Sequence, residues 1–550
     1  MSRVTASPVR RLESWKEIAA YLTRGIRTVR RWESEEGLPV HRHVHRTLGS
    51  VYAFESEIDA WQTSRQRPAR RAVTAAGPAG GDAATMKSLA VLPFANLSRD
   101  PDNEYFADGL TEEVIADLYK VRTLRVISRT SSMRFKGTKK DVRTIARELG
   151  VSYILQGSVR RAGSRLRISA QLINAATDDH LWVDTYDGTI EDVFAIQERL
   201  ARVIVAALEL RLTTDEDRRL AQRPVGHVQA YECYLRARQE GWRWRRDAID
   251  RAVQLLTDGL AIVGDNAGLY AALGLAHLQY REAGIDFTDR PLREADACAR
   301  KAFAHDPDSA RGWLLRAWIH YSRGRIQEAV HDLALALEIE PYNPDTLLLL
   351  CNCYLISGKV AVARPLIERL LAVDPLTPLS CCLPGWADVL DGKFVAAVAP
   401  YRRMFEMDTG NPMARLFYVW VLVLNRDAET VRAIADGFPQ DMRDTVPARV
   451  ASFLAHALEG NVLDMQAALP PDVETLATSG DVFPRMLAHG YALASMPRQA
   501  IHWLTIAVGH GFINYPFLAR HESPFDGLRS DPHFDGLMEV VRERWETFQS

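Results

Sequence analysis

Arginine is concentrated in one short stretch of this 550-residue sequence. The segment 24–31 holds five residues suited to nucleic-acid contact, which are Arg24, Arg27, Thr28, Arg30 and Arg31. A guanidinium group can form paired hydrogen bonds with a phosphate or with the edge of a guanine base. The whole chain has a formal net charge of -2, so any affinity for nucleic acid must be local. Residues 1–71 carry more basic than acidic side chains, which favours phosphate contact there.

Two short helices joined by a tight turn are predicted to position these residues. Ser14 and Glu17 form a capping-box pattern, and the apolar residues that follow recur with helical spacing. A second helix over about 26–35 would turn Val29 and Trp32 inward. It would leave Arg27, Thr28, Arg30 and Arg31 on its outer sides. This is the helix-turn-helix arrangement, whose second helix enters the major groove of DNA.

The residues after this helix alternate as a two-stranded hairpin would. VHRHVH and GSVYAF flank a turn at 46–49, and a third helix over about 56–61 would turn Ile58 and Trp61 inward. The strings W-x-E-I-A-x-Y-L, R-T-V-x-R-W and G-L-P-V, with this hairpin, resemble the winged helix-turn-helix of the MerR and excisionase group over residues 12–63. The resemblance implies that Arg27, Thr28, Arg30 and Arg31 lie on the recognition helix. It also implies that Arg42 or Arg46 contacts DNA from the wing.

Two other interpretations of this region stay open. The first is a charged surface helix without a nucleic-acid role. The second is a metal site, because His41, His43 and His45 alternate along one face of the predicted strand. No cysteine or carboxylate stands nearby at a suitable spacing, so we expect this face to meet solvent or phosphate, and we predict no metal.

Residues 64–86 are rich in Ala, Gly, Pro and Arg, which predicts a flexible linker. Beyond them, strands first alternate with helices and then follow one another, which predicts an α/β module with a mixed sheet over 87–212. The strings AVLPFANLSRDPDNEYFADGLTEEVIADL, ISRTSSMRFKG and ELGVSYILQGSV resemble the TolB amino-terminal-like module of bacterial regulators. That resemblance implies a signalling or binding module.

Several residues of this module could in principle do chemistry. The acidic and histidine candidates are Asp108, Glu112, Glu113, Asp178, Asp179 and His180. General acid–base catalysis needs such groups at set distances in a cleft, which adjacent residues at a helix start or a turn seldom provide. No phosphate-binding loop, dinucleotide fingerprint, hydrolase elbow or zinc-protease motif is present. We therefore expect no catalytic residue, no cofactor and no enzymatic activity.

The stretch Ser128–Ser132, which includes Arg129, follows a predicted strand. Its hydroxyl and backbone N–H groups could hold an anion. The alternative is a capped turn without a ligand. Such a stretch is more often a capped turn, and this is the interpretation that we prefer.

The second half of the chain repeats with a period of 34 residues. Acidic residues recur at Asp306, Glu340, Asp374 and Asp408, glycines at 324, 358 and 392, and alanines at 329, 363 and 397. This pattern is the tetratricopeptide (TPR) signature, and it predicts an all-α solenoid over 226–500 that presents a groove to a protein or peptide. Residues 501–550 are predicted to form capping helices over the exposed face of the last repeat. Cys351, Cys353, Cys381 and Cys382 are interpreted as small buried residues of the repeats.

These observations describe a multidomain protein with a small winged helix-turn-helix, an α/β module and a TPR solenoid. We expect a cytoplasmic location without membrane contact, because no export signal or spanning run is present and six scattered cysteines suit a reducing compartment. The preferred hypothesis is a non-enzymatic transcriptional regulator that binds double-stranded DNA, with a sensing or transmitting α/β module and a protein partner in the TPR groove. A homodimer is left open. The alternatives are a cytoplasmic TPR adaptor whose helix-turn-helix contacts protein, and an enzymatic middle module.

Overall fold

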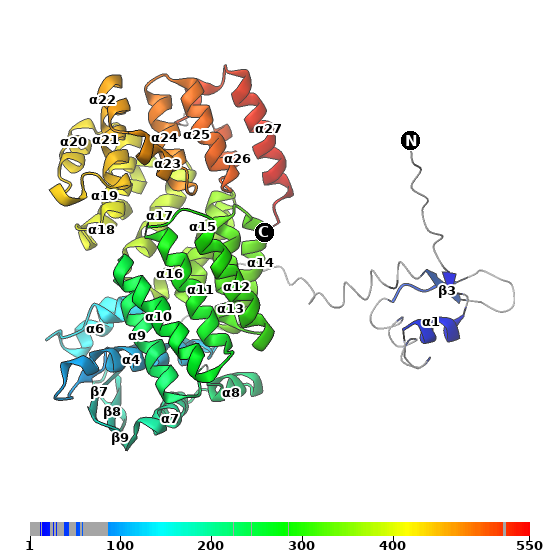
Figure 1. Ribbon diagram of the computed structural model, residues 1–550, viewed down its shortest axis with the longest axis vertical. Helices are drawn as coiled ribbons and strands as arrows, with labels where there is room; N and C mark the ends of the chain where they lie inside the picture. The colour runs from blue at the N-terminus through cyan, green and yellow to red at the C-terminus, as the bar shows by residue number, and fades with distance from the viewer. Residues whose placement is uncertain are drawn as a thin grey trace. The chain divides into compact units, whose positions relative to one another are not determined.

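The structure is a computed structural model of the chain (Figure 1). It describes residues 11–12, 14–22, 26, 29, 33, 38–42, 51–54, 58, 86–223, 225–243, 245–283, 285–520 and 524–549. The chain divides into two compact units, Met1–Thr74 and Ala75–Ser550. Each unit is described by itself below.

The first unit contains a helix and a three-stranded antiparallel sheet. Helix α1 (Trp15–Tyr21) begins after Ser14, whose side chain accepts a hydrogen bond from the Glu17 amide, as the capping pattern predicts. The strands are β1 (Arg11–Leu12), β2 (His41–Arg42) and β3 (Val51–Phe54), with β3 in the middle. Strands β2 and β3 belong to the predicted hairpin and pair with His41 opposite Tyr52. Strand β1 was not predicted, because two residues are too few to show a period.

A small apolar core lies inside this unit. Its buried side chains are Leu12, Ile18, Ala19, Leu22, Val29, Leu38, Ala53 and Ile58. Val29 is helical and fully buried, and so is Ile58, in agreement with the predicted second and third helices. The predicted inward positions of Trp32 and Trp61 lie outside the described residues.

The second unit begins with a six-stranded mixed sheet in the order β6-β4-β7-β8-β9, with β5 paired to β7. The strands are β4 (Lys87–Val91), β5 (Ala95–Asn96), β6 (Leu124–Val126), β7 (Tyr153–Ala162), β8 (Arg165–Asn174) and β9 (His180–Thr189). Strand β4 runs parallel to β6 and β7, while β7, β8 and β9 form an antiparallel meander. The predicted mixed sheet is confirmed.

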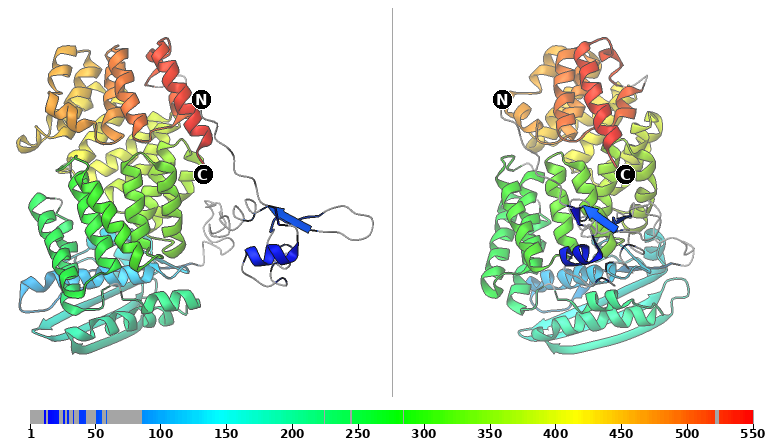
Figure 2. Two further views of the ribbon diagram at one scale, coloured as in Figure 1. Left: turned by 45° about the vertical axis from the view of Figure 1, so that its right-hand side comes forward. Right: turned by 90° about the vertical axis from the view of Figure 1, so that its right-hand side faces the viewer.

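Helices pack on both faces of this sheet. Leu89 and Val91 share an apolar cluster with α4 (Glu104–Tyr119) and α7 (Val193–Ala207). Ala90 and Leu92 share another with α6 (Val142–Leu149), because successive side chains of a strand point to opposite faces. The remaining short elements are η1 (Pro101–Asn103), α5 (Arg129–Met133), η2 (Ile190–Asp192) and α8 (Thr214–Ala221). Figure 2 shows α4 lying between the sheet and the helices that follow in the chain.

The rest of the second unit is a helical array. It begins with α9 (Val228–Gly241), α10 (Arg246–Val263), α11 (Ala267–Glu282) and α12 (Arg290–His305). The regular part is α13 (Ala310–Ser322), α14 (Ile326–Ile339), α15 (Pro344–Ile356), α16 (Val360–Val373), α17 (Pro378–Leu390), α18 (Phe394–Met407), α19 (Pro412–Leu424) and α20 (Ala428–Asp436). These paired helices restart every 34 residues, as the sequence period predicts. Gly324, Gly358 and Gly392 have φ of 69°, 72° and 77° in the turns within repeats, a conformation that glycine adopts without a Cβ clash.

The array ends with helices of varied length that follow the regular repeats. They are η3 (Gln440–Met442), α21 (Val446–Glu459), α22 (Val462–Ala467), α23 (Pro471–Ala477), α24 (Val482–Leu493), α25 (Pro497–Gly509), α26 (Tyr515–Ala519), η4 (Asp526–Leu528) and α27 (Pro532–Thr547). None of the described helices is long and apolar enough to cross a membrane.

Residues 509–520, which we call the strap, lie against the turns of three successive repeats. The Ile513 amide donates to the Ile356 carbonyl at 3.0 Å, and Asn514 Nδ2 donates to the Leu355 carbonyl at 2.8 Å. Further on, the Gln549 amide donates to Gln327 Oε1 at 2.7 Å. Residues 501–550 were expected to cover the last repeat, whereas Asn514 and Gln549 contact repeats about 150 to 220 positions earlier. The apolar side chains that hold the strap there include Phe512, Ile513 and Phe517, all buried.

Candidate functional site

The residues predicted to contact DNA lie almost entirely outside the described part of the chain. This applies to Arg24, Arg27, Thr28, Arg30, Arg31 and Arg46. For Arg42 the backbone is described, in β2 opposite Val51. Their role therefore stays a prediction.

Basic and aromatic side chains gather on the small sheet of the first unit. The His41 and Tyr52 rings stack with centroids 5.1 Å apart, and the Arg11 guanidinium lies 4.2 Å from the Tyr52 centroid. His43 and His45, considered as metal ligands with His41, lie outside the described residues. Within the described part of the chain, no group of three or more His, Cys, Asp or Glu side chains is placed to hold a metal ion.

The acidic candidates on α4 are held in ion pairs. Glu112 Oε2 lies 2.9 Å from Arg129 Nε, and the other carboxylate oxygen pairs with Arg238 of α9. Burial alone would raise the pKa of Glu112, but Arg238 and Arg129 outweigh it and hold that pKa below its usual value. Lys136 donates to Asp108 at 2.6 Å. These carboxylates form pairs inside the α/β module and between the module and the array.

Glu113 extends the same junction toward a second helix of the array. Its Oε1 accepts a hydrogen bond from the Tyr234 hydroxyl at 3.1 Å and from Arg311 Nη2 at 3.3 Å. Tyr234 lies on α9 and Arg311 on α13, so one carboxylate of the α/β module connects two helices of the array. Neither partner was predicted, because nothing local in the sequence pairs residues more than 100 positions apart.

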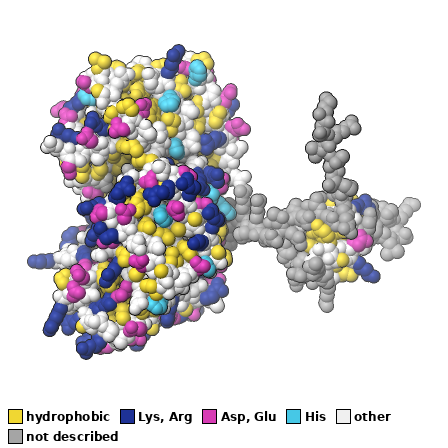
Figure 3. Space-filling model, viewed as in Figure 1, with side chains coloured by type: hydrophobic (Ala, Val, Ile, Leu, Met, Phe, Trp, Pro, Cys, Tyr) yellow, Lys and Arg dark blue, Asp and Glu magenta, His cyan; other side chains and the backbone are white. Residues whose placement is uncertain are grey.

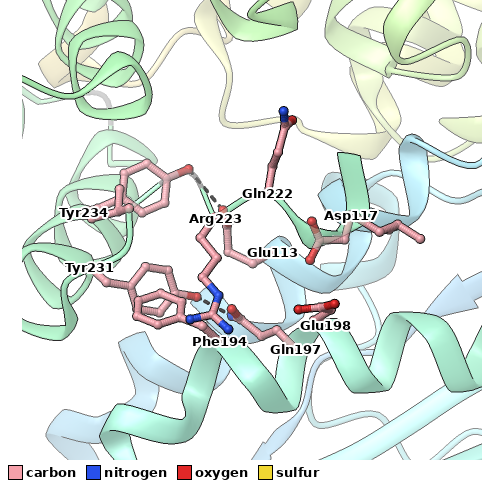
Figure 4. Close-up of a pocket in the computed structure, with 11 residues that line it drawn as sticks. Glu113, Asp117, Phe194, Gln197, Glu198, Gln222, Arg223, Tyr231 and Tyr234 are labelled. Carbon is pink, nitrogen blue, oxygen red and sulfur yellow. Dashed lines mark hydrogen bonds between the residues drawn. The ribbon is translucent and has the colours of Figure 1, made fainter. Parts of the chain in front are cut away.

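A small cavity opens beside this junction, between α4, α7 and α9 (Figure 4). Its volume is about 20 Å³, which is room for about one water molecule. Gln197 Nε2 donates to the Tyr231 hydroxyl at 2.5 Å, and Tyr234 points to Glu113 on the other side. Burial raises the pKa of Tyr231 well above its usual value, so this phenol stays neutral. The cavity is a packing feature, too small for an organic ligand.

The stretch Ser128–Ser132 forms the capped turn that was preferred, because the Ser128 hydroxyl accepts a hydrogen bond from the Ser131 amide at 3.0 Å at the start of α5. Its hydroxyl groups also hold an anion, which is a carboxylate of the same chain. Asp374, the acidic residue of the 34-residue period, is 4% exposed and inserts its carboxylate among hydroxyl groups. Its oxygens accept hydrogen bonds from Ser128, from Ser131 at 2.8 Å, from Thr377 at 2.6 Å and from Ser380 at 2.5 Å. The Ser128 amide also donates to the Val373 carbonyl at 2.7 Å. We call this contact between α5 and the array the serine–aspartate latch.

A larger cavity lies inside the helical array. It has a volume of about 540 Å³ and is bounded by α11, α13, α19, α21 and α24. Aromatic side chains such as Phe287, Trp318 and Phe483 form much of its wall, with Asp481 among the polar groups. The α/β module contacts the loops between repeats and the strap contacts the turns within them. This inner cavity is the candidate for the predicted TPR groove, and its occupation by a partner stays a prediction.

The other residues considered for chemistry lie at a turn, on the surface or in the core. Asp178 and Asp179 lie at the turn before β9, where Asp178 has a φ of 69°, and His180 is exposed. Cys351, Cys353, Cys381 and Cys382 are free and buried, which confirms their interpretation. On the face seen in Figure 3, basic and acidic side chains are mixed over the second unit, in keeping with the near-neutral chain.

Comparisons with known proteins cover parts of the chain. Residues 85–203 match the family model "HilA/YgeH-like transcriptional regulator, second domain", and residues 320–379 match a tetratricopeptide repeat model. Among solved structures, PilF of Pseudomonas aeruginosa is 17% identical, with a TM-score of 0.30 over 37% of this chain and 88% of its own. TolB of Acinetobacter baumannii is 16% identical, with a TM-score of 0.18 over 22% of this chain and 28% of its own. Scores this low carry no argument about function, and the MerR and TolB resemblances stay predictions.

One curated relative corrects an expectation. A Rhizobium meliloti (strain 1021) protein named "Putative adenylate cyclase 3" is 36% identical over 302 residues, which are 53% of this chain and 51% of the relative. The chain thus spans about half the length of the curated relative that it matches. The expectation of no enzymatic activity is therefore wrong as stated. It depended mainly on the absence of known catalytic motifs, whereas a relative that is 36% identical carries the name of an enzyme. What the family models establish is that the chain contains a HilA/YgeH-like transcriptional regulator second domain and tetratricopeptide repeats.

Proposed function

We propose that this protein is a transcriptional regulator whose first unit binds double-stranded DNA and whose helical array binds a protein partner. The observation that carries the proposal is the match of residues 85–203 to a transcriptional-regulator domain. An arginine-rich unit with a capped helix and a small antiparallel sheet precedes that domain. These are elements that a winged helix-turn-helix uses to place a helix in the major groove.

The α/β module is proposed to transmit signals, since it is bonded to the array. The serine–aspartate latch, the Glu112–Arg238 pair and the Glu113–Arg311 pair all join the two. A partner seated in the inner cavity of the array would therefore act on the array and the α/β module together. The adaptor alternative, in which the first unit contacts protein, is decided by the DNA measurement below.

The full chain should bind duplex DNA with an affinity that falls steeply with salt. Each phosphate contact should contribute about 0.9 to the slope of log affinity against log salt concentration. Arg27→Ala and Arg31→Ala should each reduce that slope if they contact phosphate, or relax sequence preference at one position if they contact a base. Fluorescence anisotropy with random and selected duplexes measures both quantities.

The control for this measurement is Arg542→Ala, which removes an exposed arginine from α27 of the second unit. Its slope and affinity should equal those of the unmodified chain. If the full chain shows no duplex binding at low salt, the regulator proposal fails and the adaptor becomes the better account.

The array should lose stability when its packing is overfilled. Ala363 is fully buried between repeat helices, so Ala363→Trp is expected to destabilise the array by about 1–3 kcal/mol. Val395→Trp, at a position 83% exposed, is the matched control and should be close to neutral. Thermal unfolding measures the first effect, and DNA binding by each variant should be unchanged. Loss of DNA binding in Ala363→Trp would mean that the two units are not independent.

Adenylate cyclase activity is a second candidate function, on the strength of the relative's name. Incubating the full chain with ATP and Mg²⁺ or Mn²⁺ and quantifying cyclic AMP tests it directly. Turnover above that of a heat-denatured sample would support the activity in this chain. Product at the level of the denatured sample would restrict the named activity to the half of the relative that this chain does not match.

A further inference from the structure

One repeat of the array departs from the glycine period. Gly324, Gly358 and Gly392 stand 34 residues apart in left-handed turns, and the next position in the series is Arg426. Arg426 keeps the left-handed backbone, with a φ of 59°. This conformation is disfavoured for any residue with a Cβ, so the turn retains a strained arginine where its neighbours use glycine. Strain of this kind often marks a functional position.

The Arg426 side chain lines a cavity of about 540 Å³. Arg520, at the end of the strap, lines the same cavity, and so does His489 of α24. Phe394 and Leu493 contribute apolar wall. A volume of this size falls in the range of small-molecule sites.

Within the part of the chain that the structure describes, neither guanidinium group has a carboxylate partner. Among the described residues, neither Arg426 nor Arg520 forms an ion pair, whereas the acidic residue of the cavity, Asp526, is held by Arg529 at 2.7 Å. The Arg520 guanidinium packs over the backbone of Gly392, where an added Cβ would lie 2.9 Å from Nη1. Both arginines are exposed residues that line the cavity, and neither guanidinium group has a counter-charge among the described residues.

His489 adds a buried polar group that faces this charge. It is 3% exposed, and its Nδ1 has no hydrogen-bond partner in the described part of the chain. Burial, followed by the nearby Arg426 guanidinium, lowers the pKa of His489 to about 3, so the imidazole is neutral. A neutral imidazole carries one N–H donor and one acceptor.

We propose that this cavity binds a small organic phosphate, with Arg426 and Arg520 on the phosphate oxygens. Guanidinium groups bind phosphate through paired hydrogen bonds, which gives both charge and geometry. The His489 imidazole supplies a further donor, and the apolar wall receives the organic part of the ligand. The site is separate from the inner cavity proposed for the protein partner.

Isothermal titration calorimetry of the full chain tests the proposal with phenyl phosphate, inorganic phosphate and phenol. Phenyl phosphate should bind more tightly than inorganic phosphate, and phenol should not bind. Arg426→Gly restores the residue of the other repeats, so it should unfold at the same or a higher temperature while weakening phenyl phosphate binding at least about tenfold, the effect of losing one charge-assisted contact. Arg520→Gln should weaken binding by a similar factor.

Arg542→Gln, an exposed arginine on α27, is the matched control and should leave phenyl phosphate affinity unchanged. Unchanged affinity in Arg426→Gly or Arg520→Gln would overturn the proposal. It would also be overturned if potassium chloride at the same ionic strength displaced the heat signal entirely. If instead Arg426→Gly weakened duplex DNA binding, the two arginines would belong to a nucleic-acid surface and the small-ligand assignment would be wrong.

Discussion

Replacing Asp374 with alanine is expected to destabilise the second unit by about 3–5 kcal/mol, because it removes the acceptor of the serine–aspartate latch. Four hydroxyl groups donate to this buried carboxylate, from Ser128, Ser131, Thr377 and Ser380. A buried hydroxyl that loses its partner costs about 1–3 kcal/mol. Urea unfolding followed by circular dichroism measures the loss. Hydrogen exchange of residues 124–134 should rise as well, because α5 loses its attachment to the array.

The chain supplies its own control one period later. Asp408 occupies the equivalent position of the next repeat but is exposed, and its carboxylate accepts from Asn411 within its own turn. Asp408→Ala should therefore stay within about 0.5 kcal/mol of the unmodified chain. If Asp374→Ala and Asp408→Ala lose the same free energy of unfolding, the acidic residue stabilises every repeat alike and the serine–aspartate latch contributes nothing.

Replacing Glu112 with alanine should cost a similar amount, about 3–5 kcal/mol, because it leaves two guanidinium groups in the junction without their carboxylate. Arg129 and Arg238 come from the module and the array, with side chains 17% and 28% exposed. Neither can be rehydrated fully while the two parts stay packed. The same urea measurement applies, and Glu368→Ala, at an exposed position of α16, is the matched control.

The same carboxylate predicts a pH dependence. Burial is the largest influence on the Glu112 pKa and would raise it, yet the guanidinium groups prevail and the pKa in the folded chain is lowered. The unfolded chain has a glutamate pKa of about 4.3, so Glu112 contributes its full stabilisation above that pH and loses it as pH falls through the lower folded value. Glu112→Gln should be less stable than the unmodified chain at pH 7, and the difference should shrink as the pH falls below about 4. Urea midpoints between pH 3 and 7 report it; a constant difference would contradict the ion-pair account.

Local pattern predicted much of this fold. The 34-residue period gave the positions of paired helices between 310 and 436, and alternation gave the strands from β7 to β9. Such signals lie within a few residues of one another, so a single sequence displays them.

Contacts between distant segments could not be predicted in this way. The hydroxyl cluster at 128–131 was recognised as suited to an anion, but its partner lies 243 residues further on at Asp374. The strap likewise joins residues 159 positions apart through Asn514 and Leu355. The sequence alone shows that Arg426 interrupts the series of turn glycines. The structure adds that the backbone at Arg426 keeps the left-handed conformation of those glycines.

The strap has a mechanical consequence for the array. Stacked helical repeats stretch and unwind like a spring, since each repeat touches only its neighbours. Here one segment crosses the turns at Gly324, Gly358 and Gly392, so the pitch of these repeats is set by a brace that spans all three. An array braced in this way cannot change its curvature to fit a partner of different shape. A braced array also loses little conformational entropy when a partner of matching shape binds. This favours binding of a preformed surface over binding in which the array wraps around the partner.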